Sequence, residues 1–183
     1  MDKLTAIKNY LESWIKGAEY LGHPDAGMCA QSYFLKHGKG YPNTMMTPDE
    51  RMELTEVLRR ATWALEIKQC FANTQRLVMI DSAEFSYAEG FALADTIPLH
   101  HAWAVWRGRP IDVTWGIASD YDVNRKTRII QRVLRNMLSN AYFGIEIEAS
   151  RIARVWMKER CARPLLEDLL REEAAKATVR DQA

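Results

Sequence analysis

The chain has 183 residues, of which 48% are hydrophobic and 27% are charged, and its net charge is +1. This length supports one ordinary hydrophobic core, and the balanced charge creates no general attraction to nucleic acid or to a membrane surface. The N-terminus carries charges where a signal peptide is apolar, and no window approaches the roughly 18 apolar residues of a membrane span. We therefore expect a single cytoplasmic domain with no membrane partner.

The first 69 residues are expected to be mainly helical. Leu4, Ile7 and Leu11 recur at helical spacing, which predicts a helix over residues 2–21. Gly22, Pro24 and Gly27 end it, and a loop-rich stretch follows up to Asn43.

A second helix should begin at Pro48, because Thr47 can cap it and Glu50 completes a capping box. No Gly or Pro marks its end, since neither occurs from residue 49 to residue 88. Our interpretation is a break within residues 64–69 and a new helix over residues 70–80. One continuous helix through Cys70 is the alternative.

The pattern then changes to that of a small antiparallel sheet. Alternating aromatic residues predict a strand from Phe85 to Leu93, and an aromatic and β-branched run predicts another from Leu99 to Trp106. Arg107 to Arg109 has the form of a hairpin turn, and Pro110 to Trp115 is the expected partner strand.

Helices are expected again in the C-terminal part. Apolar spacing predicts a helix over residues 124–139, a short extended segment or turn over 142–147, and helices over 148–160 and 164–177. The expected fold class is α+β. We divide the single domain into a helical part (1–69), a candidate catalytic core (70–147) and C-terminal helices (148–177).

Cofactor and metal sites are not indicated. The three cysteines, Cys29, Cys70 and Cys161, are odd in number and form no C-x-x-C pair, which disfavours both a disulfide framework and a zinc site. The histidines are not at metal-ligand spacing, and the chain has no glycine-rich phosphate loop. We expect Cys29 and Cys161 to serve in packing or to be exposed.

Three residues occur in an order that supports nucleophilic catalysis: Cys70, then His101 on a strand, then Asp112 on the next strand. Because side chains alternate along a strand, His101 and Trp103 share one face while His100 points to the other. A tight turn makes the two strands neighbours, so His101 and Asp112 can form a cross-strand hydrogen bond. The carboxylate would orient the imidazole toward the thiol, and a thiol beside an imidazolium at a helix N-terminus becomes a nucleophile.

The fragments His101-Ala102-Trp103 and Asp112-Val113-Thr114-Trp115 resemble the transglutaminase-like and papain-like superfamily, which includes the arylamine N-acetyltransferases. The resemblance covers about residues 70–145, and the segments around Gly90 and Gly144 are similar to uncharacterised bacterial and phage proteins of this type. It implies a nucleophilic Cys at the start of a helix that packs on a small antiparallel sheet. The Cys70 fragment lacks the Gly and Trp neighbours of papain-type sites.

Substrate contacts are assigned to three further residues: Glu89, Trp103 and Asn73. Glu89 lies in a strand beside Gly90, where it could bind a cationic or amide group, although a solvent-facing position is the alternative. Trp103 could form the wall of a pocket, with core packing as the alternative.

The function expected from the sequence is a thiol-dependent hydrolase or acyltransferase that acts on an amide, ester or thioester of a protein or small molecule. One alternative is a non-catalytic phage or mobile-element protein that binds an acidic partner through Arg125, Arg128 and Arg132. Another is a chain that is helical through its first 80 residues, with Cys70 incidental.

Overall fold

A computed structural model describes residues 2–23, 29–61, 65–117 and 125–180. Within them lie seven helices and five strands. In chain order these are α1 (Lys3–Tyr20), α2 (Ala30–His37), β1 (Lys39–Gly40), α3 (Pro48–Ala61), α4 (Cys70–Ile80), β2 (Ser86–Leu93), β3 (Leu99–Trp106), β4 (Arg109–Ile111), α5 (Arg125–Ser139), β5 (Ala141–Ile147), α6 (Ala149–Glu159) and α7 (Leu166–Arg180).

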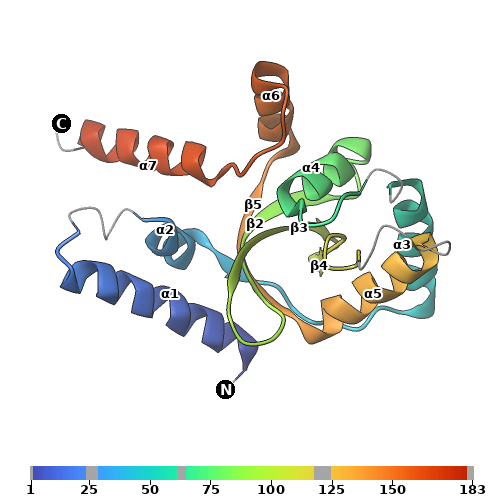
Figure 1. Ribbon diagram of the computed structural model, residues 1–183. Coiled ribbons are helices and arrows are strands. Elements are labelled where there is room, and N and C mark those ends of the chain that lie inside the picture. The colour runs from blue at the N-terminus through green and yellow to red at the C-terminus, as the bar shows by residue number, and fades with distance from the viewer. Residues whose placement is uncertain (1, 24–28, 62–64, 118–124, 181–183) are drawn as a thin grey trace.

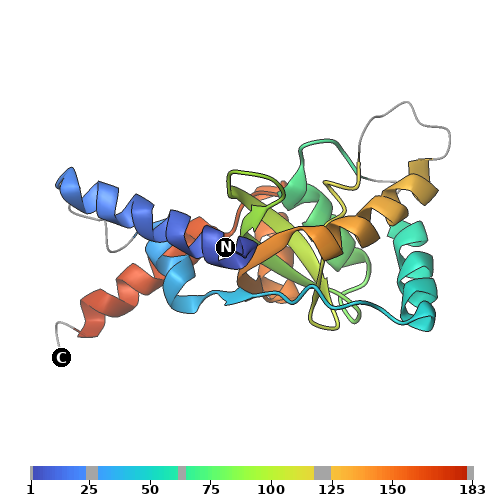
Figure 2. The ribbon, with the colours of Figure 1, turned by 90° about the horizontal axis from the view of Figure 1, so that it is seen from below.

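The strands form one antiparallel, curled sheet in the order β1-β5-β2-β3-β4. Helix α4 lies against β3 and β2, while α1 and α7 project from one end of the molecule and α3 and α5 lie at the other (Figures 1 and 2). The α+β class expected from the sequence is confirmed.

Side chains cap the starts of α1 and α3, and the cap of α3 confirms the capping box predicted from the sequence. Asp2 caps α1 by accepting from the backbone N–H groups of Leu4 and Thr5. Thr47 and Glu50 form the capping box of α3, because each side chain accepts from the other residue's backbone N–H, at 3.2 and 2.8 Å.

The interpretation that α3 ends before Cys70 is also confirmed, since α4 begins at Cys70. Helix α3 ends at Ala61, and residues 62–64 lie outside the described part of the chain. The turn at residues 67–68 contains Lys68 in a left-handed conformation (φ 61°), which interrupts helical continuation.

The sequence did not predict α2 and β1, and it left β5 as a short extended segment or turn. Helix α2 has eight residues, of which Phe34 alone is buried, so its apolar periodicity is weak. Strand β5 is buried on both faces between β1 and β2, which removes the alternation that marks a half-exposed strand. Its role as an inner strand depends on neighbours distant in the sequence.

The predicted hairpin between β3 and β4 is present, with Arg107 and Gly108 both at positive φ (50° and 76°) in its two-residue turn. Strand β4 stops at Ile111, however, so the predicted strand from Pro110 to Trp115 is too long. The physical reason is Asp112, whose Oδ1 accepts hydrogen bonds from the backbone N–H groups of Thr114 and Trp115, at 3.0 Å each. This local bonding turns the chain out of the sheet.

Two hydrophobic clusters lie on the two sides of the sheet. The larger one contains Ala102, Ala104 and Trp106 of β3, and apolar residues from all seven described helices pack in it or against it. The smaller one contains Trp103 and Val105, with Tyr41, Ala88, Ala92 and Tyr142, and Trp115 packs against it. The predicted alternation of β3 is therefore confirmed.

The close approach of β2 and β5 requires glycine, which gives a testable stability prediction. A Cβ atom on Gly144 would overlap the carbonyl oxygen of Glu89 and lie 2.8 Å from Trp103 Cη2. We expect Gly144→Ala to lower the free energy of unfolding by about 2 kcal/mol or more, as overpacking does. Gly17→Ala, where a Cβ meets nothing within 4 Å, should instead stabilise α1 by up to about 1 kcal/mol. Urea denaturation measures both changes, and equal effects would refute the steric argument.

Candidate functional site

Cys70 is the first residue of α4, and its side chain is half-buried. The N-cap residue Gln69 makes no side-chain capping bond, so it leaves the N–H groups of the first turn unsatisfied by its own amide. Strand β4 pairs with Ala104 to Trp106 only, which leaves the first half of β3 as an edge. The Thr74 hydroxyl donates to the Ala102 carbonyl at 3.2 Å, which fastens α4 to β3 next to His101.

His101 and Asp112 form the hydrogen-bonded pair expected from the alternation of the hairpin, although Asp112 lies just after β4 and not on it. His101 Nε2 and Asp112 Oδ2 are 2.7 Å apart, with the carboxylate fully buried and the imidazole 5% exposed. Trp115 stacks on the imidazole, with ring centroids 4.3 Å apart and planes 17° from parallel. The ring is thus held at its edge by Asp112 and across its face by Trp115.

Cys70 completes the arrangement. Its side chain makes a polar contact with His101, and because Asp112 occupies Nε2, Nδ1 is the ring nitrogen left for the thiol. The structure therefore brings the three predicted residues Cys70, His101 and Asp112 together. Cys29 is half-buried, with Sγ 3.4 Å from Ser32 Oγ, and Cys161 is exposed.

The electrostatics of the site favour a protonated imidazole. Burial lowers the pKa of His101, but the charge and hydrogen bond of Asp112 outweigh it, and the contact with Cys70 adds to the rise. The result is a pKa raised from 6.5 to about 10. At neutral pH His101 is therefore an imidazolium ion beside the Cys70 thiol.

Asn73, predicted to contact substrate, is buried and connects two loops of the site. Its amide accepts from the Glu66 N–H at 2.8 Å and donates to the Glu66 carbonyl at 2.6 Å and to Thr114 Oγ1 at 3.0 Å. It thereby ties the chain entering α4 to the turn that follows Asp112. Trp103, the second predicted substrate contact, is fully buried in the smaller cluster.

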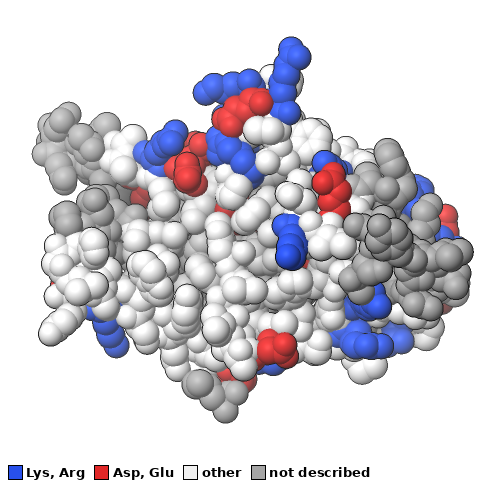
Figure 3. Space-filling model, viewed as in Figure 1, with Lys and Arg blue, Asp and Glu red and all other residues white. Residues whose placement is uncertain are grey.

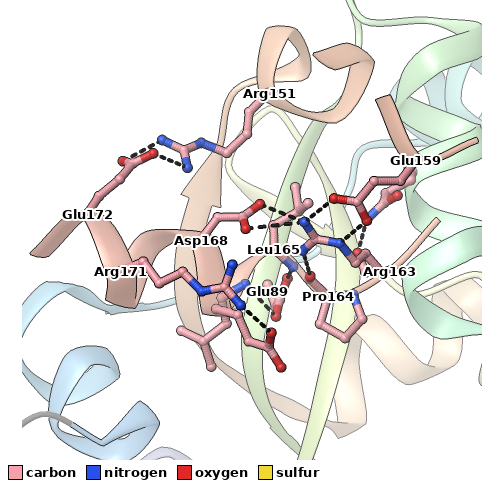
Figure 4. A network of polar contacts seen from close by, with 12 residues as sticks. Glu89, Arg151, Glu159, Arg163, Pro164, Leu165, Asp168, Arg171 and Glu172 are labelled. Atoms are coloured by element: carbon pink, nitrogen blue, oxygen red, sulfur yellow. Dashed lines mark hydrogen bonds and ion pairs between the residues drawn. The ribbon is translucent and has the colours of Figure 1, made fainter. Parts of the chain in front are cut away.

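Glu89, the third predicted substrate contact, does not face solvent. It is fully buried, and its carboxylate accepts from the backbone N–H groups of Leu165 and Leu166 where α7 begins (Figure 4). The Tyr87 hydroxyl donates to it at 2.9 Å, and His100 Nε2 lies 3.1 Å away. A helix start 76 residues later in the chain uses this carboxylate, which no local pattern of β2 could indicate.

Residues missed by the sequence argument surround Asp112. In the sequence, Thr114 and Trp115 stand out only as members of the fragment from Asp112 to Trp115. The Asp-x-Thr pattern is the sequence signal for this turn. Its aspartate accepts hydrogen bonds from the N–H groups two and three residues later, and its threonine hydroxyl accepts one from Asn73.

A cavity of about 480 Å³ adjoins the site, lined by Trp115, Ile117, Asn136 and Asn140 together with Lys3 and Asp95. Trp115, which stacks on His101, is part of its lining. A second cavity of about 540 Å³ lies between α2, β5 and α6, and its lining includes none of the three predicted catalytic residues. The first is therefore the better placed of the two to receive part of a substrate.

The basic residues of α5 are only partly described. The side chains of Arg125 and Arg128 lie outside the described residues, whereas Arg132 is half-buried and reaches the Gly116 carbonyl at 3.5 Å. Charged side chains of both signs gather over α6 at the top of Figure 3, and the centre of that face carries few charges.

The described part of the chain holds no group of three or more His, Cys, Asp or Glu side chains that could bind a metal ion. Across the same residues, no helix combines the length and apolar character that crossing a membrane would require. No family model, curated protein or solved structure matches the chain.

Proposed function

We propose that this protein is a thiol-dependent hydrolase or acyltransferase of the papain-like and transglutaminase-like type, with Cys70 as nucleophile. The observation that supports the proposal is the continuous set of contacts from Asp112 through His101 to Cys70 at the first residue of a helix. Such a thiol, next to an imidazolium and a helix N-terminus, has the setting of reactive cysteines.

The proposed reaction has two steps. The Cys70 thiolate attacks the acyl carbon of an amide, ester or thioester, and the imidazolium of His101 gives its proton to the leaving group as that bond breaks. In the second step, water or an amine attacks the thioester carbon and gives its proton to His101. The bond between the acyl carbon and the Cys70 sulfur then breaks, which releases the acyl product and restores the thiolate. N–H groups of the first turn of α4 are the candidate donors for the oxyanion formed in each step.

The test is the rate of Cys70 alkylation by iodoacetamide at pH 7, followed site by site by mass spectrometry. Cys70 is half-buried, so by exposure alone Cys161 would react first. We expect Cys70 to react about 10-fold faster than Cys161, and His101→Ala to remove this advantage.

His100→Ala is the matched control, because it removes a neighbouring imidazole that points to the opposite face of β3 and approaches Glu89. It should leave the rate at Cys70 close to that of the wild type. The proposal is wrong if Cys161 reacts first in the wild type, or if both histidine variants affect Cys70 equally.

A further inference from the structure

Tyr142 on β5 reaches the buried carboxylate of Asp112 from a strand that is not adjacent to β3 or β4. Its hydroxyl donates to Asp112 Oδ2 at 3.2 Å, the same oxygen that lies 2.7 Å from His101. Asn140 Nδ2 donates in turn to the Tyr142 oxygen at 3.4 Å. The hydrogen bonds therefore run in one direction, from Asn140 through Tyr142 to Asp112.

The surface of β2 makes this reach possible. On the face that carries His101, β2 presents Ala88, Gly90 and Ala92, so no large side chain separates β5 from β3. Tyr142 crosses above these small residues and packs on Trp103, with ring centroids 5.1 Å apart.

Tyr142 keeps its hydroxyl proton throughout the range in which a cysteine enzyme would work. The side chain is fully buried, and burial followed by the charge of Asp112 raises the pKa of Tyr142 well above 10. The phenol therefore remains a hydrogen-bond donor, and the carboxylate it faces remains its acceptor.

Both oxygens of the Asp112 carboxylate make hydrogen bonds. Oδ1 accepts from the N–H groups of Thr114 and Trp115, which belong to its own turn. Oδ2 is shared by His101 and Tyr142. The N–H donors of Thr114 and Trp115 belong to the same turn as Asp112, and His101 is the ring that the carboxylate orients. Tyr142 is therefore the donor that fixes the carboxylate relative to the sheet.

We propose that Tyr142 is a positioning residue for the Cys70 site, holding the Asp112 carboxylate in the orientation that directs His101 toward the thiol. This inference rests on the proposed function. The candidate site then comprises four side chains in contact, which come from α4 (Cys70), β3 (His101), the turn after β4 (Asp112) and β5 (Tyr142).

The experiment is a double-mutant cycle on the alkylation rate of Cys70 with iodoacetamide at pH 7, using the full chain. Tyr142→Phe removes one hydrogen bond to a charged group, and we expect the rate to fall about 10-fold. Asp112→Asn should lower the rate at least as much. In the Asp112→Asn background, Tyr142→Phe should have little further effect, because the carboxylate through which Tyr142 acts is gone.

Tyr87→Phe is the matched control for a merely structural effect. Tyr87 is also fully buried and also donates to a buried carboxylate, that of Glu89 at 2.9 Å, but on the opposite face of the sheet. Urea denaturation should show similar losses of stability for the two Phe variants, whereas only Tyr142→Phe should slow the reaction of Cys70.

The outcomes separate this inference from the function on which it rests. If His101→Ala and Asp112→Asn leave Cys70 alkylation unchanged, the proposed function and the role of Tyr142 are both wrong. If those variants slow alkylation but Tyr142→Phe does not, or if it slows alkylation by the same factor with and without Asp112, the role of Tyr142 alone is refuted.

Discussion

Replacing Glu89 with alanine is expected to lower the free energy of unfolding by about 3 to 5 kcal/mol. The carboxylate is fully buried and accepts a hydrogen bond from Tyr87. It also accepts hydrogen bonds from the N–H groups of Leu165 and Leu166 at the start of α7 (Figure 4). Alanine would leave these donors buried without acceptors, and His100 would lose its partner. The negative charge that complements the N-terminal end of α7 would also be lost.

Two variants show whether the loss comes from the buried contacts. Glu89→Gln keeps the shape but turns one acceptor into a donor, so a smaller loss of about 1 to 3 kcal/mol is expected. Glu146→Ala, on the neighbouring strand opposite Ala88, removes a partly exposed carboxylate paired with Lys39. Its effect should stay below about 1 kcal/mol.

The measurements are urea denaturation and amide hydrogen exchange. In Glu89→Ala, exchange should accelerate in α7 relative to α1, because the carboxylate binds the first turn of α7. A loss no larger than that of Glu146→Ala would contradict the assignment of Glu89 as the anchor of α7.

The raised pKa of His101 predicts that stability falls as pH increases from about 6.5 to 9. Folded His101 keeps its proton up to about pH 10, whereas the unfolded side chain loses it near 6.5. In this window the folded state binds one more proton than the unfolded state. The contribution of His101 is therefore complete below 6.5 and is lost toward 10, with a slope of up to about 1.4 kcal/mol per pH unit.

This measurement is best made in a Cys70→Ser background. The substitution removes the thiol, a second ionisable group that acts on the imidazole, and leaves His101 and Asp112 in place. Urea denaturation at several pH values should show the slope in Cys70→Ser, and Asp112→Asn in the same background should largely abolish it. An equal slope in both proteins would mean that Asp112 does not hold the imidazolium.

Part of the candidate site was predictable because its determinants are local. The spacing from Leu99 through the turn at Arg107 and Gly108 sets which side chains share a face, and this placed His101 and Asp112 on the same side. The two-residue turn required positive φ at both positions, which Gly108 supplies without a steric cost. The start of a helix at Cys70 was less clear, because no Gly or Pro marks the break.

The partners of the buried polar groups could not be predicted. Glu89 is bound by the start of α7, Asp112 by Tyr142, and Thr114 by Asn73. Each contact joins segments 30 or more residues apart. A carboxylate in a strand looks the same in sequence whether it meets solvent, a substrate or the N-terminus of a distant helix.

The sequence by itself determined the α+β class, helix α1, the capping box of α3, and the hairpin that pairs His101 with Asp112. These features depend on side-chain periodicity, capping chemistry and turn conformation, all of which act over a few residues. Only the tertiary structure decided that β5 lies inside the sheet, that Tyr142 crosses β2 to reach Asp112, and that Glu89 is buried under α7. Those outcomes depend on the order of strands in the sheet and on which distant donors satisfy each buried acceptor, because a buried polar group without a partner costs free energy.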